Sequence, residues 1–279
     1  MESELERLVE AAKEGNKKAL EGLILKIQDK VYGLALRMLY NPSDAEDASQ
    51  EILLRIITHL STFRGESAFT TWMYRVAVNH LLTIRKRRAE LEAVSFEEYE
   101  KSLGLDSAVY WPESHSSPLQ NIFVEEIRIS CLQGLLLCLD REHRLAFLLV
   151  DVFDVSSEEG AAILEITPSA FRKRLSRARE RIQDFLIKNC ALTNPDNPCT
   201  CERYLISQDY MERVEEKDLV FAQHPCRVRQ EEGTMNRIKE MDELTQIATL
   251  YKRYPDFRAP SSFIENLRDL VHSKKYELL

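Results

Sequence analysis

Basic side chains are the residues of this chain best suited to a chemical task, and they lie in two clusters. Four consecutive basic residues occupy positions 85–88, and six more fall within residues 172–181. Lys and Arg form charge-assisted hydrogen bonds with phosphate oxygens, and clusters of them attract polyanions. The pattern therefore predicts that the chain binds nucleic acid at two separate places.

The overall charge argues against nucleic-acid binding, but its distribution along the chain does not. The 279 residues carry 38 Lys/Arg and 46 Asp/Glu, a formal net charge of −8. Residues 89–130 hold 2 basic and 9 acidic residues, whereas residues 1–88 hold 14 basic and 12 acidic. The acidic stretch also contains Pro112, Pro118 and a Ser/His-rich run, which favours a linker. We therefore divide the chain into residues 1–88, an acidic linker 89–118, residues 119–189 and an extension 190–279.

The second basic cluster lies in a pattern typical of a helix-turn-helix. Ser156 or Ser157 would cap a first helix, small residues at 161–162 allow close packing, and Pro168 suits the first position of a second helix after a turn at 165–167. The first residues of a recognition helix contact base edges, and neighbouring basic residues contact phosphates. The alternative is a solvated basic face on an ordinary bundle helix. The inward residues would be Phe171, Leu175, Ala178 and Ile182, and the outward face would present Pro168, Ser169, Arg172, Lys173, Ser176 and Arg177.

The first basic cluster is preceded by aromatic residues that alternate with basic and polar ones. Aromatic faces stack on bases while basic groups hold the backbone, so this pattern favours unpaired DNA over duplex. The alternative places Phe69, Trp72 and Val76 in the core. The alternating residues are Phe63, Arg64, Phe69, Trp72, Tyr74, Arg75 and Asn79, followed by the basic run at 85–88.

Apolar residues recur at three- and four-residue spacing, which predicts an all-α fold. No run alternates as a strand would, and no Gly-rich loop suits a phosphate. Ser43 or Asp44 would cap the second helix, whose inward stripe is Ala45, Ala48, Ile52, Ile56 and Leu60. We expect helices over residues 17–40, 44–63, 69–88, 119–138, 141–151, 156–164 and 168–188, with further helices at about 236–251 and from 261 onward.

The segments that would direct the chain to a membrane are missing from the sequence. The longest apolar runs, at 135–139 and 145–150, are too short to cross a bilayer. The acidic, amphipathic start lacks the basic and apolar regions of a signal peptide. With few cysteines at irregular spacing, we expect a cytoplasmic protein with reduced thiols and no membrane insertion.

Four of the six cysteines lie in the extension and could supply thiolates to zinc or another soft metal, with His224 as an alternative ligand. A redox-active pair and unliganded thiols in a small helical cap are the alternatives. Cys131 and Cys138 lie on one apolar helix face and are expected to be buried. No other cofactor is required. The four candidate metal ligands are Cys190, Cys199, Cys201 and Cys226.

Two long segments together carry a family resemblance. The string DAEDASQEILLRIITHLSTFRGESAFTTWMYRVAVNHLLTIRKRR resembles region two of an extracytoplasmic-function (ECF) sigma factor, and LDREHRLAFLLVDVFDVSSEEGAAILEITPSAFRKRLSRARERIQDFL is similar to region four. With the N-terminal helix they cover residues 1 to about 189. The resemblance implies a subunit that binds core RNA polymerase, reads the −35 element as duplex and captures the melted −10 strand. Melting is then differential binding, and no catalytic residue is needed.

The resemblance also implies roles for individual residues. Polymerase binding falls on an Asp-x-x-Gln-Glu pattern at Asp47, Gln50 and Glu51, which lie opposite the apolar stripe. The acidic linker resembles the connector that enters the polymerase cleft, and the helix-turn-helix would read the −35 element. Contacts to the melted −10 strand fall on Arg64, Gly65, Ser67, Phe69, Trp72, Arg75, Asn79, His80, Arg85 and Arg88.

Some positions depart from the family pattern. Ala48 and Ser49 replace larger aliphatics, Glu165 replaces the glycine of the turn, and Ala170 replaces a threonine. His80 is also unusual and leaves the −10 preference open.

The extension is not needed for sigma activity, so we expect it to regulate promoter use, with an anti-sigma factor as a further candidate partner. A helix-turn-helix regulator that never joins polymerase is the alternative function. No nucleophile has a visible base, so an enzyme is not expected.

Overall fold

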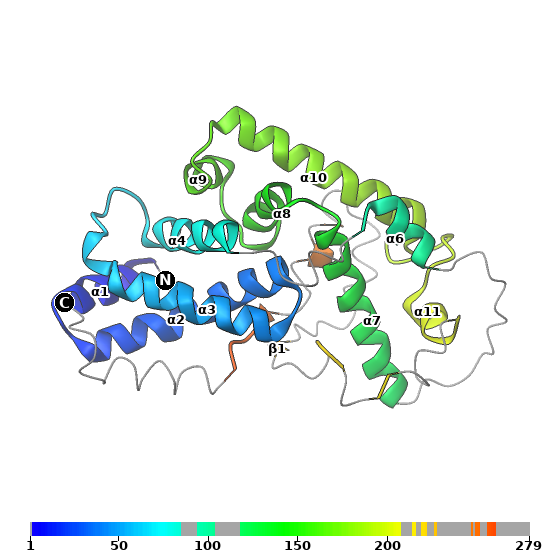
Figure 1. Cartoon of the computed structure of the whole chain (residues 1–279), viewed down its shortest axis with the longest axis horizontal. Coiled ribbons are helices and arrows are strands. Elements are labelled where there is room, and N and C mark those ends of the chain that lie inside the picture. The colour runs from blue at the N-terminus through cyan, green and yellow to red at the C-terminus, as the bar shows by residue number, and fades with distance from the viewer. Residues whose placement is uncertain are drawn as a thin grey trace.

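The computed structural model describes residues 2–84, 94–103 and 118–207, with short segments at 214–215, 219–221, 226–227, 247, 249–251 and 256–260. The described fold is all-α, as predicted, apart from one antiparallel pair of two-residue strands (Figure 1). The helices are α1 (Glu2–Lys13), α2 (Lys17–Leu39), α3 (Pro42–Thr58), α4 (Phe69–Thr83), α6 (Phe96–Ser102), α7 (Pro118–Leu137), α8 (Arg141–Phe147), α9 (Ser157–Ile163), α10 (Pro168–Asn189) and α11 (Cys201–Ser207), and the strands are β1 (Cys226–Arg227) and β2 (Asp256–Phe257). None of the described helices combines the length and apolarity that crossing a bilayer requires.

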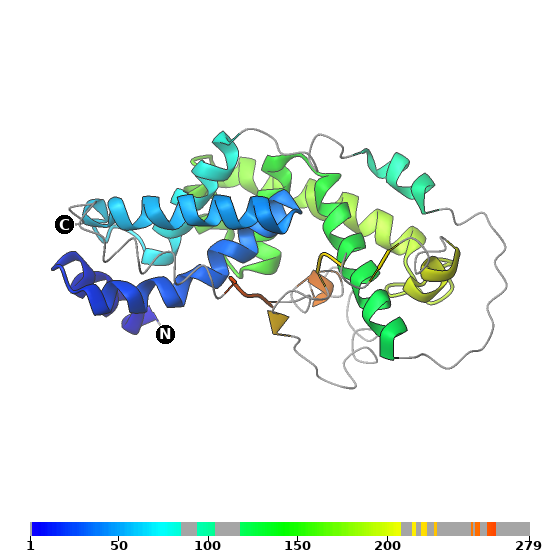
Figure 2. The same ribbon diagram turned by 60° about the horizontal axis from the view of Figure 1, so that its bottom comes forward.

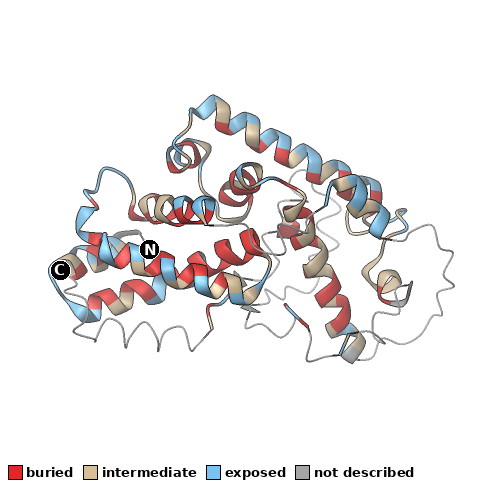
Figure 3. Cartoon of the chain, viewed as in Figure 1, coloured by how far each residue is buried: buried red, intermediate tan, exposed pale blue. Residues whose placement is uncertain are grey.

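Helices α1–α4 form an N-terminal bundle in which α2 and α3 run side by side, as the turned view shows (Figure 2). The predicted stripe of α3 is confirmed, since its members are at most 2% exposed (Figure 3). The predicted cap is wrong, because Asn41 caps α3 by accepting the N–H of Asp44 at 3.1 Å, with Pro42 in the first turn. α4 ends at Thr83, and the basic run 85–88 lies outside the described residues.

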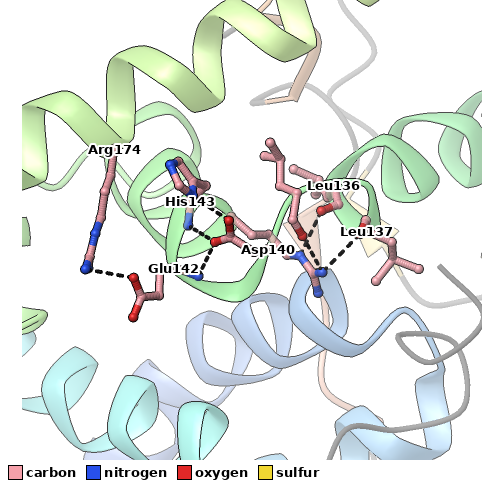
Figure 4. Close-up of polar contacts among 8 residues, drawn as sticks. Leu136, Leu137, Asp140, Glu142, His143 and Arg174 are labelled. Atoms are coloured by element: carbon pink, nitrogen blue, oxygen red, sulfur yellow. Dashed lines mark hydrogen bonds and ion pairs between the residues drawn. The ribbon is translucent and has the colours of Figure 1, made fainter. Parts of the chain in front are cut away.

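Helices α7–α10 form a second bundle, in which α10 lies across α8 and α9 (Figure 1). Asp140 caps α8 by accepting the N–H groups of Glu142 and His143, and the Glu142 carboxylate lies 2.7 Å from the Arg174 guanidinium on α10 (Figure 4). Beyond α8, residues Leu148–Val152 continue as one π-helical turn. The start of α8 is thereby fixed by capping and by an ion pair with α10.

The two bundles pack against each other through polar contacts to backbone carbonyls. Arg141 Nη1 donates to the carbonyls of Leu81 and Ile84, both at 2.9 Å, and so caps the end of α4. Arg144 is 2% exposed and donates to Met38 O on α2 as well as to carbonyls at the end of α7. Because these bonds join residues 57 to 106 positions apart, they hold the bundles in one closed arrangement.

The described parts of the extension fill the junction between the bundles. The Phe257 ring is 2% exposed and lies 4.9 Å from the Arg37 guanidinium on α2. Phe221 packs edge-on to Tyr40 with ring centroids 5.3 Å apart, and Tyr251 packs on Phe147 of α8 at 5.0 Å. The extension therefore contacts both bundles at once.

The sequence predicts a linker without helical periodicity at 89–118, but residues 94–103 contain α6. Ser95 and Glu98 form a capping box at its start. Phe96 packs on Phe185 of α10, with centroids 6.0 Å apart. At seven residues, α6 is too short to show helical periodicity, and its tertiary contacts with α10 hold it.

Candidate nucleic-acid interface

The helix-turn-helix is built around a contact between α9 and α10. Ser156 caps α9 with a capping box to Glu159, and Thr167 caps α10 by accepting the N–H of Ala170 at 3.2 Å. A Cβ added at Gly160 would lie 2.3 Å from the Phe171 ring, so this glycine allows the closest approach. From the sequence, the small residues at 161–162 were predicted to allow this close approach of the two helices.

Ala161 is 2% exposed and does face the core, but Ala162 is exposed. Sequence reasoning therefore missed Gly160. The signal was present one residue earlier in the same run of small residues.

The predicted recognition face of α10 points to solvent. All six residues assigned to DNA are exposed, whereas the four inward residues are between 0% and 4% exposed (Figure 3). Arg172 makes one long ion pair, at 3.9 Å, with the exposed Glu158 of α9. The arrangement gives the start of α10 a polar and basic surface that can enter a DNA groove. The exposed set is Pro168, Ser169, Arg172, Lys173, Ser176 and Arg177.

The rest of the basic cluster has structural partners. Arg179 forms two hydrogen bonds with Asp151, at 2.8 and 2.9 Å, and Asp151 is 6% exposed. Arg174 pairs with Glu142, and Arg181 lies over the Phe96 ring at 5.6 Å. Three of the six basic residues at 172–181 thus hold α10 to α6 and α8 and to the turn after α8. Their roles could not be read from the sequence, because their partners are 28 to 85 positions away.

Glu165 lies in the turn with φ of 54°, in the left-handed region that glycine adopts more easily. The backbone at this position therefore has the conformation for which the family's glycine is suited. A non-glycine residue there costs on the order of 1–2 kcal/mol.

The N-terminal bundle presents an exposed loop after α3. Arg64, Gly65 and Ser67 are exposed, and Gly65 has φ of 72°. Phe63 and Phe69 flank this loop with ring centroids 5.5 Å apart, and Trp72 packs on both. Phe69 is 2% exposed, so it supports the loop from within, as the core alternative predicted, while Trp72 is half-buried.

The residues assigned to the −10 strand on α4 differ in exposure. Asn79 is exposed and Arg75 is half-buried. His80 is 3% exposed, and its Nε2 lies 3.6 Å from the Glu51 carboxylate on α3. His80 therefore does not face solvent in this arrangement and instead joins α4 to α3. Arg85 and Arg88 lie outside the described residues.

The outward face of α3 is acidic and polar. Asp47 and Glu51 are exposed and Gln50 is half-buried, while Ala48 and Ile52 between them are at most 2% exposed. As predicted, the assigned side chains lie opposite the apolar stripe. They form a surface on which a basic partner could bind.

Three of the four candidate metal ligands, Cys190, Cys199 and Cys201, lie within the described residues. Cys190 and Cys199 are paired through backbone in a β-bridge. Among the residues that the structure describes, no three His, Cys, Asp or Glu side chains form a group suited to a metal ion. The side chain of Cys226 and residue His224 lie outside that description.

Gly160→Ala should destabilise the helix-turn-helix strongly. The added methyl group would overlap the Phe171 ring, and overpacking of this kind costs about 1–3 kcal/mol. Denaturant unfolding of the two proteins measures the difference. Ala162→Ser, at the exposed neighbouring position, is the control and should cost no more than about 0.5 kcal/mol. Equal stability of Gly160→Ala and the unaltered chain would contradict the packing described.

Comparisons with known proteins find two sigma-factor regions in this chain. A family model described as Sigma-70 region 2 matches residues 23–90, and one described as Sigma-70, region 4 matches residues 129–182. The chain is 33% identical over 184 residues to the RNA polymerase sigma-H factor of Pseudomonas aeruginosa, covering 65% of this chain and 93% of that protein. It is 34% identical over 184 residues to the ECF RNA polymerase sigma-E factor of Escherichia coli, covering 63% and 91%.

A solved structure of the sigma factor RpoE in complex with the anti-sigma factor NepR from Bartonella quintana superposes with a TM-score of 0.41 and 22% identity, covering 58% of this chain and 93% of that one. The two matched family regions contain the exposed face of α3, the loop after it and the recognition face of α10. Residues 183–279 lie beyond both matches. The chain belongs to the ECF family of RNA polymerase sigma factors and carries an added C-terminal extension.

Proposed function

We propose that this sigma factor binds core RNA polymerase through the outward face of α3 and reads promoters with two surfaces. The start of α10 would read the −35 duplex, and the loop at 64–68 with α4 would hold the melted −10 strand. The observation that carries this proposal is that one chain presents both an exposed acidic face, at Asp47 and Glu51, and an exposed basic face on α10. Promoter melting would then result from tighter binding of unpaired than of paired DNA, so the protein need not be an enzyme.

The closed arrangement is expected to be the inactive form. Thr71 of α4 donates to the Glu159 carboxylate of α9 at 3.4 Å, and Tyr74 packs on Phe153 with centroids 5.6 Å apart. One side of α4 is therefore covered by the helix-turn-helix that should instead read the −35 element. Both surfaces could engage a promoter only after the two bundles separate.

The extension is expected to hold this closed form. Its Phe257 and Phe221 rings pack on α2 and on each other, with 6.0 Å between their centroids, and the Ala259 N–H donates to the Asp29 carboxylate at 3.0 Å. On the other bundle, Tyr251 donates to Leu132 O at 3.0 Å. Because these contacts join both bundles, loss of them should favour the open form.

Three further properties stay predictions. We expect a cytoplasmic protein, as polymerase binding requires. An anti-sigma factor could act beside the extension. Zinc or another soft metal at Cys190, Cys199, Cys201 and Cys226 is tested by metal analysis of the purified chain, for which about one equivalent is the supporting result.

Arg172→Ala with Lys173→Ala should weaken binding to duplex DNA and reduce its salt dependence. Each lost phosphate contact lowers the slope of log K against log salt by about 0.9, so the slope should fall by up to about 2. Titration of labelled duplex at several salt concentrations measures it. Lys17→Ala with Lys18→Ala, which removes the same charge from exposed positions on α2, should leave the slope unchanged. An unchanged slope in the α10 variant would contradict the assignment of this face to DNA.

A further inference from the structure

A cavity of about 570 Å³ lies where the second bundle, α6 and the extension meet. Its walls come from α6, α7, the end of α10, the segment 190–201 and α11, and Tyr40 at the end of α2 closes one side. The volume falls within the range of about 300–1,000 Å³ that is usual for small-molecule sites. Apart from Val94, Tyr99 and Leu103, which lie in the acidic linker, none of these residues belongs to the surfaces assigned above to polymerase or DNA.

Most of the wall is apolar, with Leu103, Ile127 and Phe185 among the lining residues. None of the described lining residues is Lys, Arg or His. The acidic member, Glu126, is 2% exposed and accepts the backbone N–H groups of Val220 and Phe221 at 2.9 and 2.8 Å. Its carboxylate is thus engaged with the extension, and the described wall offers no cation to an anionic ligand.

The remaining polar groups of the described wall are thiols, hydroxyls and the side-chain amide of Asn189. Burial raises the pKa of Cys138 to about 11. Burial also raises the pKa of the Tyr40 hydroxyl and holds that of Tyr99 well above its usual value. These thiols and hydroxyls can serve as hydrogen-bonding groups beside an apolar ligand.

The wall has a preformed shape. Tyr99 of α6 lies against Gly134 of α7, where an added Cβ would be 2.6 Å from the Tyr99 hydroxyl. That hydroxyl donates to Cys131 O at 3.3 Å, and the Lys188 ammonium lies 2.7 Å from the Glu100 carboxylate. α6 is therefore fixed over the cavity by contacts with α7 and α10. Cys131 and Cys138, expected to be buried core residues, are half-buried and line this space.

We propose that this cavity binds an uncharged, predominantly apolar small molecule with one or two hydrogen-bonding groups. Such a ligand would contact both bundles and the extension at once, so its binding stabilises the closed arrangement. An effect of the ligand on transcription rests on the proposed function, whereas binding itself does not. The proposal can therefore be tested without polymerase.

The test uses N-phenyl-1-naphthylamine, a neutral aromatic amine whose fluorescence rises in apolar surroundings, with the full-length chain. We expect saturable binding near one equivalent, with a dissociation constant of about 1–100 μM, and a raised thermal unfolding midpoint. The sulfonated analogue 8-anilinonaphthalene-1-sulfonate shares the ring framework and adds a negative charge. It should bind at least about tenfold more weakly, because none of the described lining residues is Lys, Arg or His.

Cys138→Phe and Val94→Phe fill the cavity from α7 and from the α6 side, and each should weaken binding of the neutral probe at least about tenfold. Asn121→Phe, on an exposed position of α7, is the matched control and should bind as the unaltered chain does. Val94 is 41% exposed, so its substitution is compatible with folding even where Cys138→Phe is not. Equal binding of both probes, or unchanged binding in a folded Val94→Phe protein, would overturn the proposal.

Discussion

Phe257→Ala is expected to raise promoter-specific transcription by the full-length chain at least about tenfold. The ring is 2% exposed, packs on Phe221 and lies over Arg37, and it belongs to the extension and not to either sigma region. Removal of a buried Phe side chain lowers stability by about 3–5 kcal/mol. Here we expect the loss to destabilise the closed arrangement and not the open one. Every 1.4 kcal/mol is a factor of ten in an equilibrium constant, so the open form should become far more populated.

Run-off transcription with core polymerase, at equal protein concentrations, measures this increase. Arg258→Ala changes the exposed neighbour of the same residue and should leave the output unchanged. Hydrogen exchange at the backbone of α4 and α9 supplies a second measurement, because separation of the bundles would expose both helices. Equal transcription from Phe257→Ala and the unaltered chain, with faster exchange in α4, would show that closure does not limit activity.

Asp47→Arg with Glu51→Arg should lower transcription at least about 100-fold by preventing assembly with polymerase. Both side chains are exposed on α3, opposite its buried stripe, so the change alters a surface and, at Glu51, the contact with His80. Placing like charges against a basic partner costs several kcal/mol. Co-purification with core polymerase measures the loss, and it should be carried out in the Phe257→Ala background so that closure does not mask it.

The matched control reverses one acidic residue of α1 and one just after its end. Glu10→Arg with Glu14→Arg makes the same change in charge at exposed positions and should co-purify normally. Binding of the α3 variant to duplex DNA should also be unchanged, because α10 is untouched. Co-purification of the α3 variant at the level of the control would contradict the assignment of this face to polymerase.

The helices that position the two surfaces could be predicted because their signals are local. Pro168 marked the start of α10, and Phe171 and Leu175 marked its inner face. The cap of α3 was misplaced because Asn41, Ser43 and Asp44 are all good caps, and only Asn41 precedes a proline that suits the first turn.

The contacts that close the molecule could not be predicted from the sequence. Phe221 and Tyr40 are 181 positions apart, and neither lies in a periodic pattern that indicates its partner. Arg141 and Arg144 donate to backbone carbonyls of the other bundle, and no sequence pattern identifies these acceptors. Such pairings depend on how whole bundles pack, which helix periodicity does not determine.

Which basic residues of α10 form ion pairs within the fold could not be predicted either, because their partners lie on other elements. Charge counting treated Arg172, Arg174 and Arg179 alike, although the fold pairs Arg174 with Glu142 and Arg179 with Asp151. The charge count therefore indicated the right helix, and the helical spacing of its apolar residues predicted correctly that Arg172, Lys173 and Arg177 face outward.

The central claim is tested most directly by mixing the full-length chain, with and without Phe257→Ala, with core RNA polymerase and a library of promoter fragments. The account predicts that the chain co-purifies with core polymerase and yields transcripts from a defined subset of promoters, with the larger output from Phe257→Ala. Binding to duplex DNA without association with polymerase, in both proteins, would contradict it and would favour a helix-turn-helix regulator that acts alone.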